Sequence, residues 1–209
     1  MITPLPEAVL RSRLLPLIDH PDPDVVRRAA LAAERAGAPT VEIGLRHGRS
    51  LEALRAAVES VSIPVGAGTV VDPDDVVAAR RAGAAYLVSP GSTPSLIAAV
   101  VTAGAPWLPG AATPSEVLSL RDAGAGVLKI FPAGVLGGPV HLRALSAVVG
   151  GVGLVPTGGI DADSAPAYLD VPGVVAVGGS WMFSAAATDD SGADVEAAVA
   201  AALDVVRPG

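Results

Sequence analysis

Residues 82–130 read AGAAYLVSPGSTPSLIAAVVTAGAPWLPGAATPSEVLSLRDAGAGVLKI, and one short pattern recurs within them. Ala-Gly-Ala occurs at residues 82–84, 103–105 and 123–125, and a further copy lies at 36–38. Each copy follows a segment with helical patterning and precedes a β-prone run. Each glycine is therefore expected just past the end of a helix, where the backbone needs a positive φ. The pattern predicts repeated strand and helix units.

The rest of the chain extends this alternation. Short apolar runs predict eight strands, at residues 14–18, 40–43, 64–68, 86–89, 107–110, 127–130, 153–157 and 174–178. Helical patterning occupies segments such as 23–36, 51–61, 74–82, 94–103 and 114–123, and 193–206 is expected to be a closing helix. Continuously apolar strands between helices indicate a parallel sheet. Eight of them favour an α/β fold of the closed (β/α)8 TIM barrel type over an open doubly wound sheet, with residues 1–209 in a single domain.

The composition excludes several classes of function. A formal charge of -7 and a pI near 4.8 argue against binding to nucleic acid or to an anionic membrane, which both attract clustered positive charge. The absence of cysteine excludes disulfides and thiolate chemistry, and it fits a cytoplasmic protein. Residues 1–13 do not resemble a signal peptide, and no apolar run is long enough to predict a membrane span.

Lys129 stands out because it is the only lysine among 14 basic residues, and it lies in the apolar run 127–131. Arginine can replace lysine wherever a positive charge is enough, but a guanidinium cannot act as an amine nucleophile. An apolar wall and a neighbouring cation both favour a neutral amine. Such an amine can attack a ketone and form a Schiff base. The alternative is that a composition biased towards arginine left one lysine by chance.

Glu42 and Arg46 are the expected partners of Lys129. Active sites of (β/α)8 barrels form where the strands end, and Glu42 and Lys129 both lie in short apolar strands. A carboxylate and an amine are each costly to bury alone, so we expect them to share a polar pocket at the barrel mouth. Glu42 would shuttle protons, and Arg46 would hold a substrate carboxylate through paired hydrogen bonds. A structural salt bridge between Glu42 and Arg46 is the alternative.

Two glycine clusters indicate a phosphate site. Thr157-Gly158-Gly159 follows the seventh predicted strand and Gly178-Gly179-Ser180 follows the eighth. Barrels often bind phosphate in these two loops through backbone N–H groups, although tight turns alone also select glycine. The three histidines lie far apart without ligand-like pairing, so no metal site is expected.

Seven motifs occur in order between about Leu14 and Phe183, and they carry a family resemblance. They read VEIGLR (41–46), VGAGTV (65–70), SPG (89–91), LPG (108–110), KIFPA (129–133), PTGGI (156–160) and GGSW (178–181). Together they resemble the 2-keto-3-deoxy-6-phosphogluconate aldolase family, also called 2-dehydro-3-deoxy-phosphogluconate aldolase, including its bifunctional 4-hydroxy-2-oxoglutarate aldolase members.

The resemblance implies a metal-independent class I aldolase, commonly a homotrimer, without a cofactor. Its substrate would be 2-dehydro-3-deoxy-6-phospho-D-gluconate, a phosphorylated keto acid that is cleaved to pyruvate and glyceraldehyde 3-phosphate in the Entner-Doudoroff pathway. Lys129 would form the Schiff base and Glu42 would act as general acid and base. Arg46, Thr69 and Thr157 would hold the pyruvate portion, with Phe131 beside the lysine. The phosphate would bind to Gly158, Gly159, Gly178, Gly179 and Ser180.

The sequence departs from the family pattern at two places. Gly134, followed by Val135 and Leu136, stands where the family often has a glutamate, and Asp19-His20 follows the first strand where a more apolar or basic continuation is common. Both departures concern the fit to the non-reacting part of the substrate.

Three alternatives stay open on the sequence. A sister group prefers the galactonate epimer. A phosphosugar isomerase, epimerase or synthase could use Glu42 as base on the same barrel. A ligand sensor could keep the phosphate pocket without turnover, although a pure binder would not need Glu42, Arg46 and Lys129 together.

Overall fold

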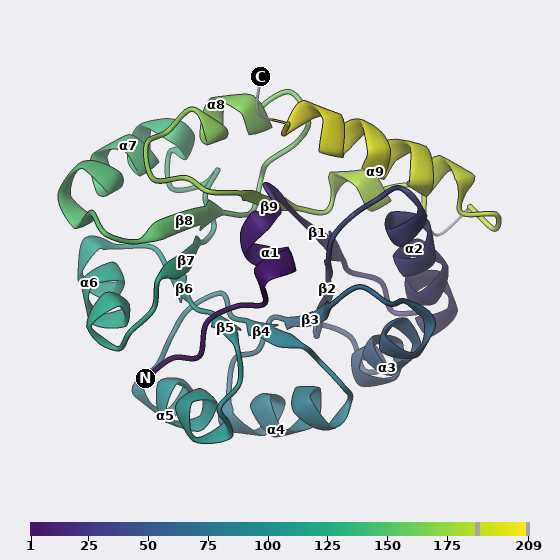
Figure 1. Cartoon of the computed structure of the whole chain (residues 1–209), viewed down its shortest axis with the longest axis horizontal. Coiled ribbons are helices and arrows are strands. Elements are labelled where there is room, and N and C mark those ends of the chain that lie inside the picture. The colour runs from purple at the N-terminus through teal and green to yellow at the C-terminus, as the bar shows by residue number, and fades with distance from the viewer. Residues whose placement is uncertain (187–188, 208–209) are drawn as a thin grey trace.

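The computed structural model describes residues 1–186 and 189–207, and it has a ring of parallel strands surrounded by helices (Figure 1). The strands are β1 (Leu14–Ile18), β2 (Val41–Gly44), β3 (Val65–Gly68), β4 (Tyr86–Val88), β5 (Trp107–Leu108), β6 (Gly110–Ala111), β7 (Val127–Ile130), β8 (Gly153–Pro156) and β9 (Val177–Gly179). The helices are α1 (Glu7–Arg11), α2 (Pro23–Arg35), α3 (Ser50–Ser60), α4 (Pro73–Arg81), α5 (Pro94–Ala103), α6 (Pro114–Asp122), α7 (Gly138–Val149), α8 (Ala165–Leu169) and α9 (Ala193–Val205), with a short 3-10 helix, η1, at Trp181–Phe183.

The strands close into the predicted (β/α)8 barrel. Hydrogen-bonded neighbours run in the order β5-β4-β3-β2-β1-β9 on one side and β6-β7-β8 on the other, and every pair is parallel. A bridge from Thr157 to Gly178 joins the end of β8 to β9, and a bridge from Leu154 to Val174 joins β8 to the segment before β9. Pro109 lies between β5 and β6, and its carbonyl accepts a hydrogen bond from Lys129 N of β7 at 2.9 Å. This bond extends the pairing of β6 with β7 towards β5.

Two predicted strands differ from the observed ones. The strand expected at 107–110 is divided into β5 and β6, because Pro109 has no N–H to donate to the ladder. The strand expected at 174–178 is observed at Val177–Gly179, and Val174 forms only an isolated bridge. Neither difference changes the order of strands around the barrel.

Local sequence signals explain where the helices begin and end. Asp72 caps α4 and Thr113 caps α6, each in a reciprocal capping box with the third helical residue. The glycines of all four Ala-Gly-Ala copies have positive φ, between 58° and 98°, as the pattern predicts. The expected closing helix is α9, although position 188 and residues 208–209 of the tail lie outside the described residues. Helices α1, α7 and α8 were not predicted.

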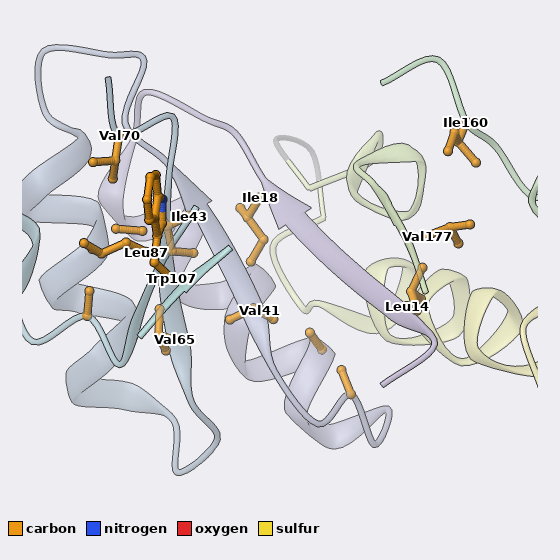
Figure 2. Close-up of a cluster of buried hydrophobic side chains, with 14 of the residues drawn as sticks. Leu14, Ile18, Val41, Ile43, Val65, Val70, Leu87, Trp107, Ile160 and Val177 are labelled. Atoms are coloured by element: carbon orange, nitrogen blue, oxygen red, sulfur yellow. The ribbon is translucent and has the colours of Figure 1, made fainter. Parts of the chain in front are cut away.

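The core has two layers, which follow from the alternation of side chains along each strand. Residues that face outwards, among them Ile43, Leu87 and Trp107, pack against the helices (Figure 2). Residues that face inwards, including Tyr86, Leu108 and Val155, form a separate cluster with Leu5 and Val9 from the N-terminal segment and α1. Helix α1 crosses the centre of the ring in Figure 1 and covers the end at which the strands begin. A ligand is therefore expected to enter from the opposite end.

No helix within residues 1–186 and 189–207 has both the length and the apolar character needed to cross a bilayer.

Candidate active site

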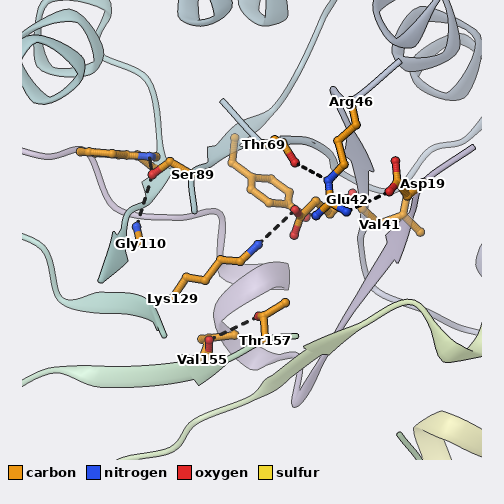
Figure 3. A network of polar contacts seen from close by, with 12 residues as sticks. Asp19, Val41, Glu42, Arg46, Thr69, Ser89, Gly110, Lys129, Val155 and Thr157 are labelled. Atoms are coloured by element: carbon orange, nitrogen blue, oxygen red, sulfur yellow. Dashed lines mark hydrogen bonds and ion pairs between the residues drawn. The ribbon is translucent and has the colours of Figure 1, made fainter. Parts of the chain in front are cut away.

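Lys129 and Glu42 face each other inside the barrel (Figure 3). They project from β7 and β2, and Lys129 Nζ lies 3.5 Å from Glu42 Oε1. Their side chains are only 4% and 1% exposed. The structure therefore confirms that these two residues meet, and it pairs Glu42 with Lys129 rather than with Arg46. Because two unpaired buried charges would each be costly, the two groups stabilise each other's presence in the barrel.

The carboxylate of Glu42 occupies space that a glycine provides. A Cβ built on Gly68 would lie 2.1 Å from Glu42 Oε1 and 2.8 Å from its Cδ, which is closer than real contacts allow. Glu42 Oε1 is buried and accepts no hydrogen bond from any residue in the described part of the chain. A carboxylate oxygen with unused acceptor capacity beside an amine can exchange a proton with that amine or with a bound substrate.

Tyr86 lies beneath this pair and has a structural role. A Cβ on Gly66 would come within 2.3 Å of the Tyr86 ring, so glycine at this position leaves room for the ring inside the barrel. The hydroxyl of Tyr86 shares a 2.8 Å hydrogen bond with Thr40 Oγ1. Burial raises the pKa of Tyr86, so its hydroxyl stays neutral. The floor of the site is therefore uncharged.

Arg46 is held at the mouth of the barrel from two sides. Its Nε donates to Thr69 Oγ1 at 3.1 Å, and its Nη1 donates to Asp19 Oδ2 at 3.0 Å. Thr69 has a φ of 60°, which is rare for a β-branched residue, and such strained conformations cluster at functional sites. The predicted pair of Arg46 and Thr69 is thus brought together, and Asp19 is a contact that sequence reasoning did not identify.

Phe131 and Thr157 border the lysine. The ring centroid of Phe131 lies 5.5 Å from Lys129 Nζ, at cation–π distance. Thr157 follows β8, the neighbour of β7, and its N–H donates to the Ile130 carbonyl at 2.9 Å. Both residues therefore lie next to Lys129, as predicted, and Figure 3 shows Thr157 close to the lysine side chain.

The two glycine clusters lie side by side because Thr157 bridges to Gly178. Gly158 and Gly159 have φ values of 95° and 73°, so their backbone is in the region that favours glycine. Gly178 and Gly179 are required for another reason. A Cβ on Gly178 would lie 2.4 Å from Thr157 Oγ1, and one on Gly179 would lie 2.2 Å from the Trp181 ring. Packing thus explains these two glycines without reference to a ligand.

Ser180 ends this second cluster at the start of η1, and it is exposed. Its carbonyl accepts a hydrogen bond from Phe183 N at 3.0 Å. Its side chain is therefore accessible to a ligand at the end of β9.

The histidines are engaged in local contacts, as predicted. His20 Nδ1 accepts from Asp22 N at 3.1 Å, His141 Nε2 lies 3.2 Å from the Ala112 carbonyl, and His47 Nε2 lies 3.1 Å from Asp19 Oδ1. Within the described ranges, His, Asp and Glu side chains form no group of three that could hold a metal ion. The departure at Asp19-His20 was the only signal in the sequence for the contacts of Asp19 with Arg46 and His47.

Comparisons with known proteins agree with this geometry. The family model described as KDPG and KHG aldolase matches residues 6–198. The 2-dehydro-3-deoxy-phosphogluconate aldolase of Pseudomonas aeruginosa is 39% identical over 181 residues, which cover 85% of this chain and 81% of that protein.

Two solved structures are similar over nearly the whole chain. The KDPG aldolase of Legionella pneumophila, with pyruvate captured as a covalent carbinolamine intermediate, has a TM-score of 0.88 at 30% identity and covers 93% of this chain and 95% of its own. The 2-keto-3-deoxy-6-phosphogluconate aldolase of Zymomonas mobilis ZM4, solved with 3-phosphoglycerate, has a TM-score of 0.88 at 34% identity and covers 94% and 93%.

Proposed function

The chain belongs to the KDPG and KHG aldolase family, and we propose that it cleaves 2-dehydro-3-deoxy-6-phospho-D-gluconate to pyruvate and glyceraldehyde 3-phosphate by Schiff-base catalysis. Family membership makes it an aldolase, a carbon–carbon lyase. The observation that supports the detailed proposal best is the buried pair of Lys129 and Glu42, with 3.5 Å between amine and carboxylate. One nucleophile and one proton carrier are what Schiff-base cleavage requires.

In the first half of the proposed reaction, the neutral amine of Lys129 attacks the C2 ketone of the substrate. Glu42, which took this amine's proton before the attack, gives it to the C2 hydroxyl of the resulting carbinolamine. Water leaves, and the iminium ion that forms draws electrons from the neighbouring carbons. Glu42 removes the proton of the C4 hydroxyl, the C3–C4 bond breaks, and its electron pair moves into the enamine. Glyceraldehyde 3-phosphate leaves with the new aldehyde at the former C4.

In the second half, Glu42 returns a proton to C3 of the enamine and restores the iminium ion. Water then adds to C2 while Glu42 takes one of its protons, and the carbinolamine collapses to release pyruvate and the amine of Lys129. The amine recovers the proton from Glu42. Glu42 begins and ends the cycle as a carboxylate, so no further acid or base is needed. Its Oε1 is suited to this role because it accepts no hydrogen bond from the described residues, so none has to be broken first.

Binding of the substrate would use both sides of the barrel mouth. Arg46 would pair with the carboxylate, and Thr69 and Thr157 would contact the pyruvate portion beside Phe131. The phosphate would bind at the paired glycine clusters through Gly158, Gly159, Gly178, Gly179 and Ser180. Backbone N–H groups in such loops bind anions without a lysine or arginine. This suits a protein of net charge -7, which must attract an anion locally.

The decisive experiment is to trap the Schiff base. Incubation with pyruvate and borohydride should attach a reduced pyruvyl group to the peptide that contains Lys129, and chelators should leave activity unchanged. Lys129→Arg, which keeps the charge but lacks a nucleophilic amine, is the matched control and should neither trap pyruvate nor cleave substrate. An intact wild-type protein that forms no adduct at Lys129 would refute the mechanism.

Substrate choice needs a direct comparison of cleavage rates. We expect faster cleavage of the gluconate substrate than of its galactonate epimer, and we also propose a side activity on 4-hydroxy-2-oxoglutarate that yields pyruvate and glyoxylate. Substantial residual turnover in Lys129→Arg would instead favour an isomerase or epimerase that uses Glu42 as base. A homotrimer and a cytoplasmic location stay predictions, and sedimentation velocity tests the first.

A further inference from the structure

Asp19 is a charged residue at the barrel mouth to which the proposed reaction assigns no role. It follows β1 directly, and its carboxylate lies between two side chains of the loop after β2. Asp19 Oδ2 accepts from Arg46 Nη1 at 3.0 Å (Figure 3). Asp19 Oδ1 lies 3.1 Å from His47 Nε2. Arg46 is the residue proposed to bind the substrate carboxylate, so a contact with Asp19 affects how its guanidinium is oriented.

The position of Asp19 is built into the fold. Its side chain is 22% exposed, whereas Arg46 is 42% exposed, so the acid is the more enclosed member of the pair. Gly44 at the end of β2 leaves room for it, because a Cβ on Gly44 would lie 2.9 Å from Asp19 Oδ1. His47 Nε2 contacts the same oxygen. Asp19 is therefore confined by its neighbours and is not a freely rotating surface acid.

Two contacts use some of the N–H donors of Arg46 and leave the others available. Thr69 takes the Nε–H and Asp19 takes an Nη1–H, while the N–H groups of Nη2 make no hydrogen bond to the described residues. A guanidinium held at Nε and Nη1 has a fixed plane, and its remaining edge points in one direction. An ion pair at this exposure contributes little to stability. Its main effect is to order a flexible side chain before a ligand arrives, which reduces the entropic cost of binding.

We propose that Asp19 is a positioning residue that orients Arg46 to receive the carboxylate of the substrate, with His47 supporting Asp19. The inference rests on the proposed function. It adds a residue to those that the proposed function already names. Asp19 acts through Arg46 and does not contact the reacting atoms.

The test compares Asp19→Ala, Asp19→Asn and Asp24→Asn. Loss of Asp19 in the alanine variant should raise the KM for the keto acid about tenfold, since one ordered, charge-assisted contact is removed. The pyruvate concentration for half-maximal borohydride trapping should rise equally, while kcat at saturation and the melting temperature stay close to wild type. Asp19→Asn keeps an acceptor for Arg46 and should show a smaller increase. Asp24 is an exposed acid in the first turn of α2, so its variant should behave as wild type.

A double-mutant comparison separates positioning from other roles. In an Arg46→Ala background, Asp19→Ala should raise KM no further, because the residue it positions is gone. An unchanged or lowered KM in Asp19→Ala, or an equal increase with and without Arg46, would overturn the proposal. If Asp19→Ala does not fold, Asp19→Asn gives the same comparison. Failure of wild-type protein to trap pyruvate at Lys129 would instead refute the proposed function, so the two failures are distinguishable.

Discussion

Replacement of Gly68 by alanine tests whether the fold leaves space at this position for the carboxylate of Glu42. The added Cβ would lie 2.1 Å from Glu42 Oε1 and 2.8 Å from both Cδ and Cγ. Non-bonded heavy atoms settle about 3.5 Å apart, so the carboxylate would have to withdraw by about 1 Å. The φ of Gly68 is not in the left-handed region, so alanine adds no backbone strain. The steric effect on Glu42 is thus isolated.

The displacement should reduce catalysis more than it reduces stability. A misplacement of about 1 Å at a catalytic group costs about 100-fold in rate, which corresponds to about 2.7 kcal/mol of transition-state stabilisation. Overpacking of a core site costs about 1–3 kcal/mol of folding free energy. We therefore expect a folded Gly68→Ala protein with a lowered melting temperature and about 1% of wild-type kcat/KM. Pyruvate release from the phosphorylated keto acid and thermal unfolding provide the two measurements.

Two further variants separate steric displacement from a general effect of alanine. Gly126→Ala is the matched control, because a Cβ there meets no atom within 4 Å and the residue lies just before β7 at the far end of the strand. It should keep wild-type activity. Glu42→Asp in the Gly68→Ala background removes a methylene and should restore part of the stability, but not the activity, because the shorter carboxylate is farther from Lys129. Wild-type kcat/KM and melting temperature in Gly68→Ala would refute the packing argument.

Two predictions concern stability away from the reaction. Glu116→Gln at the α6 capping box should make the free energy of unfolding less sensitive to acid. Hydrogen bonds from Ala112 N and Thr113 lower the pKa of the Glu116 carboxyl in the folded protein. The stabilisation by this carboxylate is therefore present above about pH 4.3 and is lost as the pH falls through the folded pKa. Urea unfolding between pH 6 and pH 3 measures this, and an equal slope in both proteins would contradict it. Tyr86→Phe should cost about 1 kcal/mol at pH 7, because the buried hydroxyl loses its hydrogen bond with Thr40. Burial raises the pKa of Tyr86, so the stabilisation by its neutral hydroxyl is present below the unfolded pKa and is lost as the pH rises towards the folded pKa. Tyr86→Phe removes this titrating group, so the variant should lose less stability than wild type above about pH 10. Denaturant titrations at these pH values provide the measurement.

Local signals made most of the fold predictable. The glycines of the Ala-Gly-Ala copies require positive φ wherever they occur, and Asp72 and Thr113 satisfy helix N–H groups without help from distant residues. Helix α1 is different, because it is five residues long and depends on contacts of Val9 inside the barrel. Short helices have little stability of their own, so their sequences carry weak signals.

The candidate site was predictable as a set of residues but not as an arrangement. Lys129 was identifiable because no other lysine occurs, and Glu42 because a carboxylate is unusual in an apolar strand. Asp19 was not identifiable as a partner of Arg46, since an acid after a strand is common in exposed loops. Its role depends on the space that Gly44 leaves and on the direction in which Arg46 extends from the neighbouring loop.

By itself, then, the sequence determined the alternation of strands and helices and the residue types available for chemistry. These properties depend on backbone preferences and on the apolar character of short runs, which neighbouring residues define. Only the tertiary structure decided that Glu42 pairs with Lys129 at 3.5 Å and that Gly68 leaves room for the carboxylate. Distances across a barrel depend on the number, tilt and stagger of all its strands, so they exist only once the ring has closed.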